Sequence, residues 1–566
     1  MIRRTLVVIL ALLPLLLLHR VIDNRVPAHR VFLNANVITM DVDDSRYQAV
    51  AVSSGNIQAV GSNDEIRRLI QPGTLVSDLQ GATLLPGFID AHSHFPSSGL
   101  QAVLVDLAPP PIGDTASIPV LLQRMRDYIK RKNPDADDWV IGYGYDDSSI
   151  AERRHPNRSE LDTISTTRPV YVWHSSGHMG VANSRALELL GIDADTENPF
   201  GGVIVRDTKT GEPTGLLQET AAPSTSTILG NISYIDYLRI VRRAVDDYAA
   251  SGITTAQTGG ANLTMIRAMK VASLIRLLPF RLNVWPKHEA LGSAIHSGEI
   301  EPQRYNDERF HIGPIKILAD GSPQGRTAYL TRPYHTNPPD RPDARGFPAY
   351  SLEVLTQMVQ HYHEAGMQMA IHGNGDAAID DIISAFEHAQ AQHPHIDPRL
   401  ILVHAQMART DQLERMQQLG ITPSFFSNHV YYWGDAHFEL HMGPERASNI
   451  SPAASAERAG LRYSIHADTP VTPINPLRLI NSAVERQSTG GRLLGENETV
   501  SVLAALRAVT IDAAWQMKQE ATRGSIEPGK FADFVVLSGD PTTPQQNIID
   551  LQIVETIVSG ETIYHR

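Results

Sequence analysis

The sequence predicts an α/β protein: a distorted (β/α)8 TIM barrel with a composite β-sandwich domain formed by both chain ends. Three observations predict it. Short apolar runs alternate with helix-like segments through the middle of the chain, a pattern typical of a parallel sheet covered on both faces. Short β-like segments separated by turn residues flank that middle on both sides. Several of the apolar runs stop at His, Lys or Asp, and strand ends meet at one mouth of a barrel.

Composition restricts the class of protein. The chain has 566 residues, 42% hydrophobic content, a formal net charge of −13 and no cysteine. The negative charge and the lack of a basic cluster argue against a nucleic-acid partner, so we expect a small-molecule substrate. Without cysteine there are no disulfides or thiolate ligands, and any metal must use His, carboxylate or a less usual donor. A homodimer is compatible with the sequence.

The N-terminal residues 1–28 read as an export signal. A basic start, Met1 to Arg4, precedes an apolar run from Leu6 to Leu18. As a helix this run spans about 20 Å, short of the roughly 30 Å hydrocarbon core. We therefore expect a signal peptide and a periplasmic or secreted protein. An uncleaved anchor, with N-terminal membrane association, is the alternative.

The composite sandwich is predicted from residues 30–83 and 516–566, because both contain short β-like runs. Chain termini often lie close together, so the two ends can pair. Residues 84–515 form the barrel. Its predicted strands are Leu84–Ile89, Gly252–Ala256, Arg281–Trp285, Pro314–Leu318, Gln368–Ile371, Leu400–Val403, Ile421–Phe425 and Arg462–Ile465. Its predicted helices include Leu352–Ala365, Ala377–Ala391, Gln412–Leu419 and Glu445–Ala459.

The gap after the first predicted strand is too long for one crossover. Residues of about 98–248 must therefore hold an insertion, which includes Tyr143–Asp147 and Trp173–Asn183. The segment Asn428–Asp435 after the seventh strand should overhang the barrel mouth. Its aromatic side chains either bind a hydrophobic substrate or pack as a plain loop.

Polar side chains follow the predicted strands. Side chains alternate along a strand, so His92 and His94 project to the same face after the first strand. Neutral imidazole is a good ligand for zinc and similar ions. The later strands end in Lys316, His372, His404, His466 and Asp468. Because these ends converge in a barrel, the sequence predicts a metal site at its mouth.

At this point the chain resembles the amidohydrolase superfamily, in the branch that includes N-substituted formamide deformylases. The likeness runs from about residue 30 to the end. The matching motifs are Pro-Gly-Phe-Ile-Asp-Ala-His-Ser-His (86–94), Gly-His-Met-Gly-Val-Ala-Asn-Ser (177–184), Lys-Ile-Leu-Ala-Asp-Gly-Ser (316–322), His-Gly-Asn-Gly-Asp (372–376), Val-His-Ala-Gln (403–406), His-Ala-Asp-Thr-Pro (466–470) and Gly-Lys-Phe-Ala-Asp (529–533).

The resemblance implies a ligand set for one or two divalent ions, with zinc expected. His92, His94 and Asp468 would hold one ion, and His372 and His404 a second. Lys316 resembles a lysine that takes up CO2 and bridges both ions as a carbamate. The alternative for Lys316 is an uncarboxylated amine that contacts substrate beside a single ion.

The resemblance also implies hydrolysis of a carbon–nitrogen bond, most simply of an amide or N-acyl amine, by a metal-activated water. Asp468 would accept the proton of that water and deliver it to the leaving nitrogen. His178 is a candidate donor to the oxyanion, or else a buried histidine of the insertion. His178, His466, Asp320 and Trp433 are the candidate substrate-binding residues, although Asp320 is favoured as a loop brace. Two departures from the branch are Val403, where glutamate is common, and His466, where a small residue is usual.

Two other functions compete with this one. Hydrolysis of a ring C–N bond, or deamination of a heterocycle, could use the same site. A barrel that lost catalysis and serves as a binding scaffold would need missing ligands, and no ligand of the motif set is missing.

Overall fold

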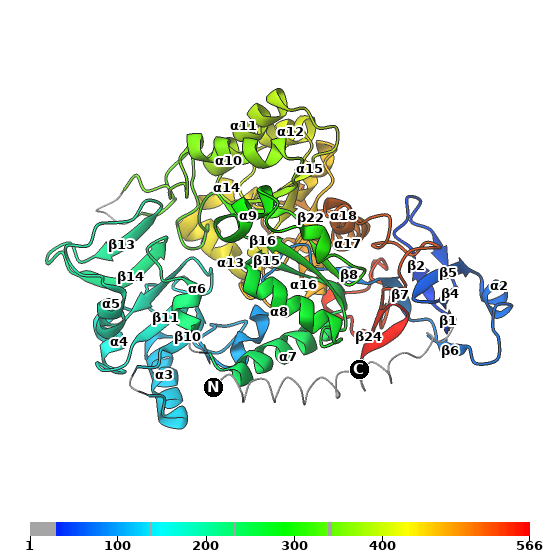
Figure 1. The fold of residues 1–566 in the computed structure, drawn as a ribbon, viewed down its shortest axis with the longest axis horizontal. Helices are drawn as coiled ribbons and strands as arrows, with labels where there is room; N and C mark the ends of the chain where they lie inside the picture. Colours follow the sequence, from blue (N-terminus) through cyan, green and yellow to red (C-terminus); the bar gives the residue numbers. More distant parts are fainter. Residues whose placement is uncertain (1–29, 136, 231, 338–341) are drawn as a thin grey trace.

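The structure, a computed structural model, describes residues 30–135, 137–230, 232–337 and 342–566. The export signal expected in residues 1–28 lies outside them. Figure 1 shows three regions along the long axis: the insertion at the left, parallel strands with their helices in the middle, and the strands of both chain ends at the right. Within the described residues, every helix is too short or too polar to cross a bilayer.

The two chain ends share one sheet. β7 (Thr83–Pro86) pairs antiparallel with β23 (Phe534–Leu537), which joins an N-terminal strand to a C-terminal one. The six-stranded sheet has the order β25-β24-β23-β7-β2-β3, with β2 at Asn36–Ile38, β3 at Arg46–Tyr47, β24 at Ile553–Val558 and β25 at Glu561–His565. A four-stranded sheet has the order β5-β4-β1-β6, with β1 at Arg30–Leu33, β4 at Ala49–Ser53, β5 at Asn56–Gly61 and β6 at Leu75–Asp78.

Apolar side chains of both sheets pack into one core. Phe32 of β1 meets Phe534 of β23 edge to face, with ring centroids 5.6 Å apart. Leu84, Val536 and Ile557 belong to the same buried cluster. Residues far apart in the chain therefore bury their apolar surface together, which is the main favourable term in folding.

The middle of the chain contains two parallel sheets whose strands follow chain order. The first comprises β8 (Phe88–Ile89), β15 (Ile253–Ala261), β16 (Arg281–Pro286) and β17 (Phe310–Ile312). The second comprises β18 (Ile315–Leu318), β19 (Met369–Gly373), β20 (Leu400–His404), β21 (Ile421–Phe425) and β22 (Ser464–Ile465). β17 runs directly into β18, and a parallel bridge joins Lys287 to Lys316. The result is a mixed α/β fold of TIM-barrel type.

The prediction of a single strand over Leu84–Ile89 was wrong. β7 ends at Pro86 in the terminal sheet, and β8 begins at Phe88 in the central sheet. Gly87 lies at the crossing point, where a Cβ atom would approach the Thr254 side chain to 2.1 Å. Only glycine lets the backbone pass from one sheet to the other beside Thr254.

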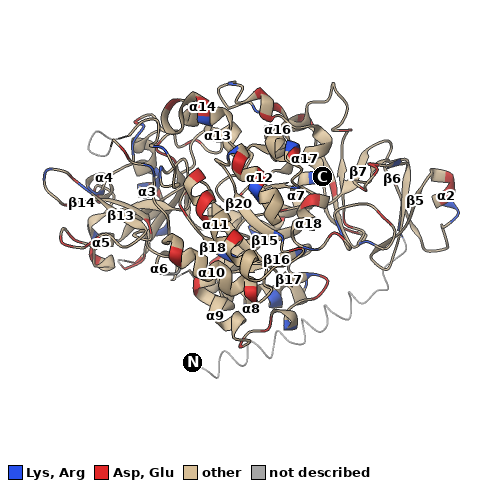
Figure 2. Ribbon diagram, turned by 90° about the horizontal axis from the view of Figure 1, so that it is seen from above, with Lys and Arg blue, Asp and Glu red and all other residues tan. Residues whose placement is uncertain are grey.

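Helices connect and cover the central strands (Figures 1 and 2). Acidic and basic residues are interspersed along these helices (Figure 2). The helices are α7 (Tyr234–Ala250), α8 (Leu263–Leu274), α9 (Ser293–His296), α10 (Leu352–Glu364), α11 (Asp376–Gln392), α12 (Thr410–Leu419), α13 (Asn428–Ala436), α14 (Gly443–Ser448), α15 (Ala453–Arg458), α16 (Pro476–Glu485), α17 (Val502–Ala508) and α18 (Ile511–Gln516).

The structure differs from the sequence-based expectations in two segments, one expected as a helix and one for which a loop was an alternative. The helix expected over Glu445–Ala459 is two helices, α14 and α15, because Pro452 lacks a backbone N–H and Ser451 has a positive φ of 51°. The segment Asn428–Asp435 is not a loop: it forms helix α13, with Val430 and Trp433 buried.

The insertion has its own six-stranded sheet of order β13-β14-β12-β11-β10-β9. β10 and β11 run parallel, so their carboxyl ends lie side by side. The strands are β9 (Val105–Asp106), β10 (Val140–Tyr145), β11 (Val170–His174), β12 (Met179–Ala182), β13 (Gly202–Arg206) and β14 (Pro213–Glu219). Its helices are α3 (Ile118–Lys132), α4 (Arg158–Asp162), α5 (Ser184–Leu190) and α6 (Thr225–Leu229), and the remaining short helix α2 (Asn63–Arg67) lies in the N-terminal region.

Candidate metal centre

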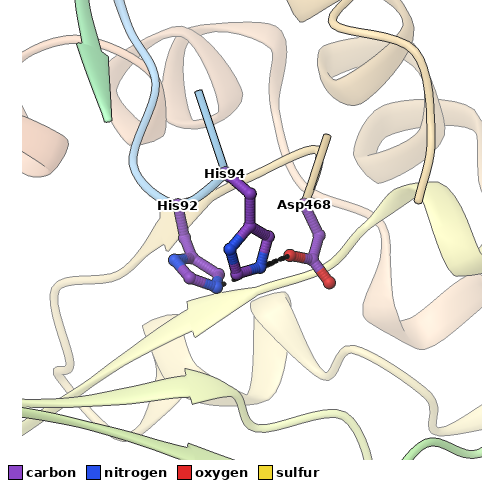
Figure 3. Close-up of side chains that lie close together, drawn as sticks. All are labelled: His92, His94 and Asp468. Atoms are coloured by element: carbon purple, nitrogen blue, oxygen red, sulfur yellow. Dashed lines mark ion pairs between the residues drawn. The ribbon is translucent and has the colours of Figure 1, made fainter. Parts of the chain in front are cut away.

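The first and last central strands bring three candidate ligands together. The side chains of His92, His94 and Asp468 point toward one another (Figure 3). Asp468 Oδ1 lies 3.5 Å from His92 Nε2 and 3.2 Å from His94 Nε2. Two backbone hydrogen bonds fix this arrangement: Asp468 N–H donates to the His92 carbonyl, and His94 N–H donates to the Thr469 carbonyl.

Neighbouring groups orient both imidazoles. His94 Nδ1 donates to the Gly259 carbonyl at 2.8 Å, which leaves Nε2 as the free nitrogen beside Asp468. His92 stacks on Trp285, with ring centroids 5.2 Å apart. Burial and the nearby Lys316 hold the pKa of His92 well below its ordinary value. The ring is therefore neutral at pH 7, the form that binds metal.

Lys316 lies in β18 beside these ligands. It is buried, and its Nζ donates to His92 Nε2 at 3.2 Å. Burial lowers the pKa of Lys316 to about 7, although Asp468 acts in the opposite direction. A substantial fraction of this amine is therefore neutral at pH 7, and it is the neutral form that can react with CO2.

His372 and His404, at the ends of β19 and β20, complete the cluster of expected ligands. His404 Nε2 lies 3.0 Å from His372 Nδ1, and the His404 ring lies 5.6 Å from the His92 ring. His404 and Asp468 both have positive φ angles, 74° and 50°. Such backbone conformations are uncommon outside glycine and cluster at functional sites.

His466 and Asp320, two candidate substrate-binding residues, are bonded to other parts of the protein. Both ring nitrogens of His466 are engaged, Nε2 by His404 Nδ1 at 3.0 Å and Nδ1 by Ser424 Oγ at 2.9 Å. Asp320 accepts backbone N–H groups of Tyr329, Asn374 and Gly375. These contacts hold His466 against His404 and join Asp320 to the surrounding loops, the bracing role favoured for Asp320. Substrate contact by either residue stays a prediction.

His178 lies next to the ligand cluster, and its ring centroid is 5.2 Å from that of His372. His178 Nδ1 donates to Glu219 Oε2 at 2.7 Å. Burial lowers the pKa of His178, but the Glu219 carboxylate outweighs burial and raises it above the ordinary value. His178 therefore holds its second proton more strongly than an ordinary histidine does.

Glu219 was missed by the sequence reasoning. It ends β14 and is held beside His178 by the pairing of β12 with β14, in which Glu219 N–H donates to the His178 carbonyl. The two residues are 41 positions apart, and Glu219 belongs to no recognised motif. Ser424, which contacts His466, and Gln257, which accepts the Ser93 N–H at 2.7 Å, were missed for the same reason.

A cavity of about 350 Å³ lies between the insertion, α7, α13 and the segment that begins at Thr469, directly after Asp468. Tyr143, Asp146 and Trp433 are among its lining residues. Trp433 Nε1 donates to Asp146 Oδ2 at 2.5 Å, so α13 is joined to the insertion across this wall. Trp433 therefore lines this cavity, and its contact with substrate stays a prediction.

The donor set fits a divalent metal ion. The ligand atoms of His92, His94 and Asp468 all lie within 4.8 Å of one another. Asp468 Oδ1 is buried and has no hydrogen-bond partner among the described residues. A buried carboxylate oxygen left unpaired is costly, and a bound cation would compensate it. Imidazole and carboxylate donors suit zinc and other first-row transition metals.

The sequence and structure were compared with known proteins. A model of the amidohydrolase family matches residues 75–564. N-substituted formamide deformylase of Arthrobacter pascens is 32% identical over 95% of this chain and 98% of that protein. The putative amidohydrolase YtcJ of Bacillus subtilis is 29% identical over 94% and 98% of the two chains. An uncharacterized metal-dependent hydrolase from Pyrococcus horikoshii has a similar fold, with a TM-score of 0.72, 23% identity, and coverage of 92% of this chain and 99% of that one.

Proposed function

This chain belongs to the amidohydrolase family and is a metal-dependent hydrolase of carbon–nitrogen bonds, and we propose that its substrates are N-acyl amines. N-substituted formamides are the first class to test, because a relative with 32% identity over 95% of the chain is a deformylase of such compounds. The observation that carries the proposal is the meeting of His92, His94 and Asp468 around one point.

We propose zinc as the ion held by His92, His94 and Asp468, and a second ion that His372 and His404 would hold. When bound, the metal lowers the pKa of a coordinated water and polarises the substrate carbonyl. The chain positions its ligands for this: the Gly259 carbonyl sets the tautomer of His94, and His466 and Ser424 orient His404. Such outer contacts fix ring orientation and raise ligand basicity.

Lys316 is proposed to carry a carbamate. Its burial, its lowered pKa and its 3.2 Å contact with His92 support this role. Reaction with CO2 would turn the amine into an anion with two oxygens, which suits a position between two cations. A mass increase of one CO2 on the intact protein would test it, and an unmodified Lys316 in active enzyme would refute it.

Asp468 is proposed as the proton carrier. Its Oδ1 faces both His92 and His94 and is free of other hydrogen bonds from described residues. Burial raises the pKa of Asp468, but His94, His466 and Lys316 outweigh burial and hold it below its usual range. The carboxylate is thus ionised and able to accept the proton of the attacking water before passing it to the leaving nitrogen.

His178 is proposed as the oxyanion donor. The Glu219 carboxylate accepts the Nδ1 proton of His178. It also raises the pKa of His178, which favours a second proton on Nε2. That Nε2 proton is the one proposed to bond to the substrate oxygen. The cavity lined by Tyr143 and Trp433 is proposed to receive the apolar part of the amine.

Three further features of the chain are proposals. We propose that the two central sheets close as one (β/α)8 barrel within residues 84–515, with β8 as its first strand and β17 and β18 sharing one position. We propose that residues 30–83 and 516–566 form one sandwich domain, which β7 also joins. The backbone bonds between Asp468 and His92 support closure, and the mixed cluster around Phe32 and Phe534 supports the sandwich. The basic and apolar start of the sequence supports export to the periplasm or medium, with an uncleaved anchor as the alternative.

The deciding experiment combines metal depletion with a substrate screen. Purified protein is incubated with N-substituted formamides, N-acyl amines and N-acyl amino acids, and the released amine is measured. Activity should vanish after chelation and return with Zn²⁺. Release of ammonia from heterocycles in place of amine from amides would favour a deaminase. A metal-free, folded and inactive preparation that Zn²⁺ does not activate would refute catalysis.

A further inference from the structure

A second cluster of histidine and aspartate lies in the insertion. Asp146 and Asp147 directly follow β10, and His174 ends the neighbouring parallel strand β11. His155 comes from the segment after them. The parallel pairing places these strand ends side by side, in the way that the central strands place their own ligands.

The separations between these side chains suit a metal ion. The ligand atoms of Asp146, Asp147 and His174 all lie within 4.8 Å of one another. Asp147 Oδ1 is 3.2 Å from His174 Nε2 and 3.7 Å from His155 Nε2. Tetrahedral zinc with bonds of about 2.0–2.1 Å would hold neighbouring ligand atoms about 3.3–3.4 Å apart. The observed separations bracket that value.

Hydrogen bonds from Ser148, Ser175 and Trp433 satisfy Asp146, but two other atoms of the cluster are left without a partner among the described residues. His174 is fully buried, and both its Nε2 and Asp147 Oδ1 lack hydrogen-bond partners among those residues. The two atoms lie 3.2 Å apart, the separation of an ion pair, without meeting the geometry of a hydrogen bond. A cation that lies off the line between them would satisfy both atoms.

The opposite ring nitrogens are anchored, as in metal sites. His174 Nδ1 lies 2.9 Å from Ser176 Oγ, and His155 Nδ1 lies 3.1 Å from the Tyr145 hydroxyl. The Ser176 backbone N–H donates to His174 Nδ1 at 3.1 Å when Nδ1 is unprotonated. Metal binding at Nε2 requires the other tautomer, in which Nδ1 is protonated and donates to Ser176 Oγ.

The cluster repeats the geometry of the site formed by His92, His94, Asp468 and Lys316, here called the barrel centre. There too a buried Asp468 oxygen has no hydrogen-bond partner among the described residues and lies 3.2 Å and 3.5 Å from two imidazole nitrogens. We propose that Asp147, His155 and His174, with Asp146 beside them, bind one divalent transition-metal ion. The two imidazoles favour Zn²⁺ over Ca²⁺ or Mg²⁺, which prefer oxygen donors.

The ion in the insertion has a structural role. Asp146 accepts the Trp433 indole N–H at 2.5 Å, so an ion beside Asp146 stiffens the contact between the insertion and α13. The side chains of Asp147 and His155 are 21% and 23% exposed, which gives the ion a path of entry. This site does not depend on the proposed reaction, because it shares no ligand with the barrel centre.

The test measures zinc in the full-length protein. Wild type, Asp147→Asn and the control Asp195→Asn, an exposed aspartate of the same insertion, are stripped with chelator, reloaded with Zn²⁺ alone and assayed by mass spectrometry. Asp147→Asn should contain about one ion per chain fewer than wild type, and Asp195→Asn should match wild type. Equal content in all three folded proteins would overturn the proposal.

A second measurement covers a variant that fails to fold. Crystals of the zinc-loaded wild type are examined by anomalous diffraction at the zinc edge. A peak in bonding contact with His174 Nε2 and Asp147 Oδ1 supports the site, and a peak confined to the barrel centre refutes it. In crystals of His92→Ala, loss of the peak at the barrel centre with the insertion peak retained would show that the two sites bind zinc independently.

Discussion

The barrel centre and the insertion cluster contain the same elements and differ in how the chain assembles them. The barrel centre joins side chains that are hundreds of residues apart, His92 and Asp468 among them, and it includes Lys316. The insertion cluster draws on 29 consecutive positions, from Asp146 to His174. The His94 side chain is 40% exposed, whereas His174 is fully buried. The exposed His94 leaves room for a substrate beside the ion, whereas the insertion cluster is reached only past Asp147 and His155, which are 21% and 23% exposed. An open coordination position suits catalysis, and a site closed by its own ligands suits structure.

The largest effect is expected from removing a ligand of the barrel centre, where the reaction is proposed to occur. His92→Ala and Asp468→Asn should each reduce amine release below detection, because each removes a metal ligand, and Asp468→Asn also removes the proton acceptor. Circular dichroism should show an intact fold. Substantial turnover in Asp468→Asn would exclude Asp468 as the proton carrier. Asp195→Asn, an exposed aspartate, serves as the control.

The next effect concerns the edge of the barrel centre. His178→Gln should lower kcat by about 10²–10³-fold if His178 donates to the oxyanion. The Glu219 carboxylate raises the pKa of His178, so the imidazolium donor is lost as pH rises through that raised value. Glu219→Gln lowers the pKa, and the alkaline limb of the pH–rate profile should therefore move to lower pH. An unmoved limb would remove Glu219 and His178 from the catalytic step.

A smaller effect is expected on thermal stability, through the ion proposed in the insertion cluster. At free Zn²⁺ about 100 times its Kd, a bound ion adds about 2.7 kcal/mol to the free energy of unfolding. Zinc should therefore raise the unfolding temperature of wild type more than that of Asp147→Asn or His174→Gln. Differential scanning calorimetry with and without Zn²⁺ measures this. Equal shifts in wild type and both variants would contradict a structural ion.

The smallest effect tests support from outside the ligand set. Ser424→Ala removes the hydroxyl that holds His466 against His404. Loss of such a contact typically weakens metal binding by about 10–100-fold, so chelator competition should detect a weaker barrel site. The insertion site should be unaffected. Metal affinity equal to wild type would show that His466 holds its position without Ser424.

Much of the central region could be predicted, because strand ends carry the chemistry. The strand Ile421–Phe425 was predicted to the residue, and His92, Lys316, His404 and Asp468 do converge. Local pattern could not reveal that Gly87 lets the chain change sheets, since the cause is its close approach to Thr254. The apolar run of residues 84–89 looks the same whether it lies in one sheet or is divided between two, so its pattern could not show the division.

The partners of the site residues were harder to predict than the ligands. Glu219 reaches His178 only through the pairing of β12 with β14, and Ser424 reaches His466 only through the pairing of β21 with β22. The insertion cluster was within reach of the sequence, because Tyr143–Asp147 and Trp173–Asn183 stood out in it. What was missing was the parallel pairing of β10 with β11.

The sheet shared by the two chain ends also limits how early the chain can finish folding during its synthesis. β7 has β23 as its neighbour, and Leu84 stands opposite Val536. A ribosome must therefore release almost the entire polypeptide before its earliest strands gain their final partner. Until then an apolar strand edge stays exposed, the condition under which chains associate wrongly. Nascent chains truncated shortly before β23 should bind chaperones more strongly than the finished protein.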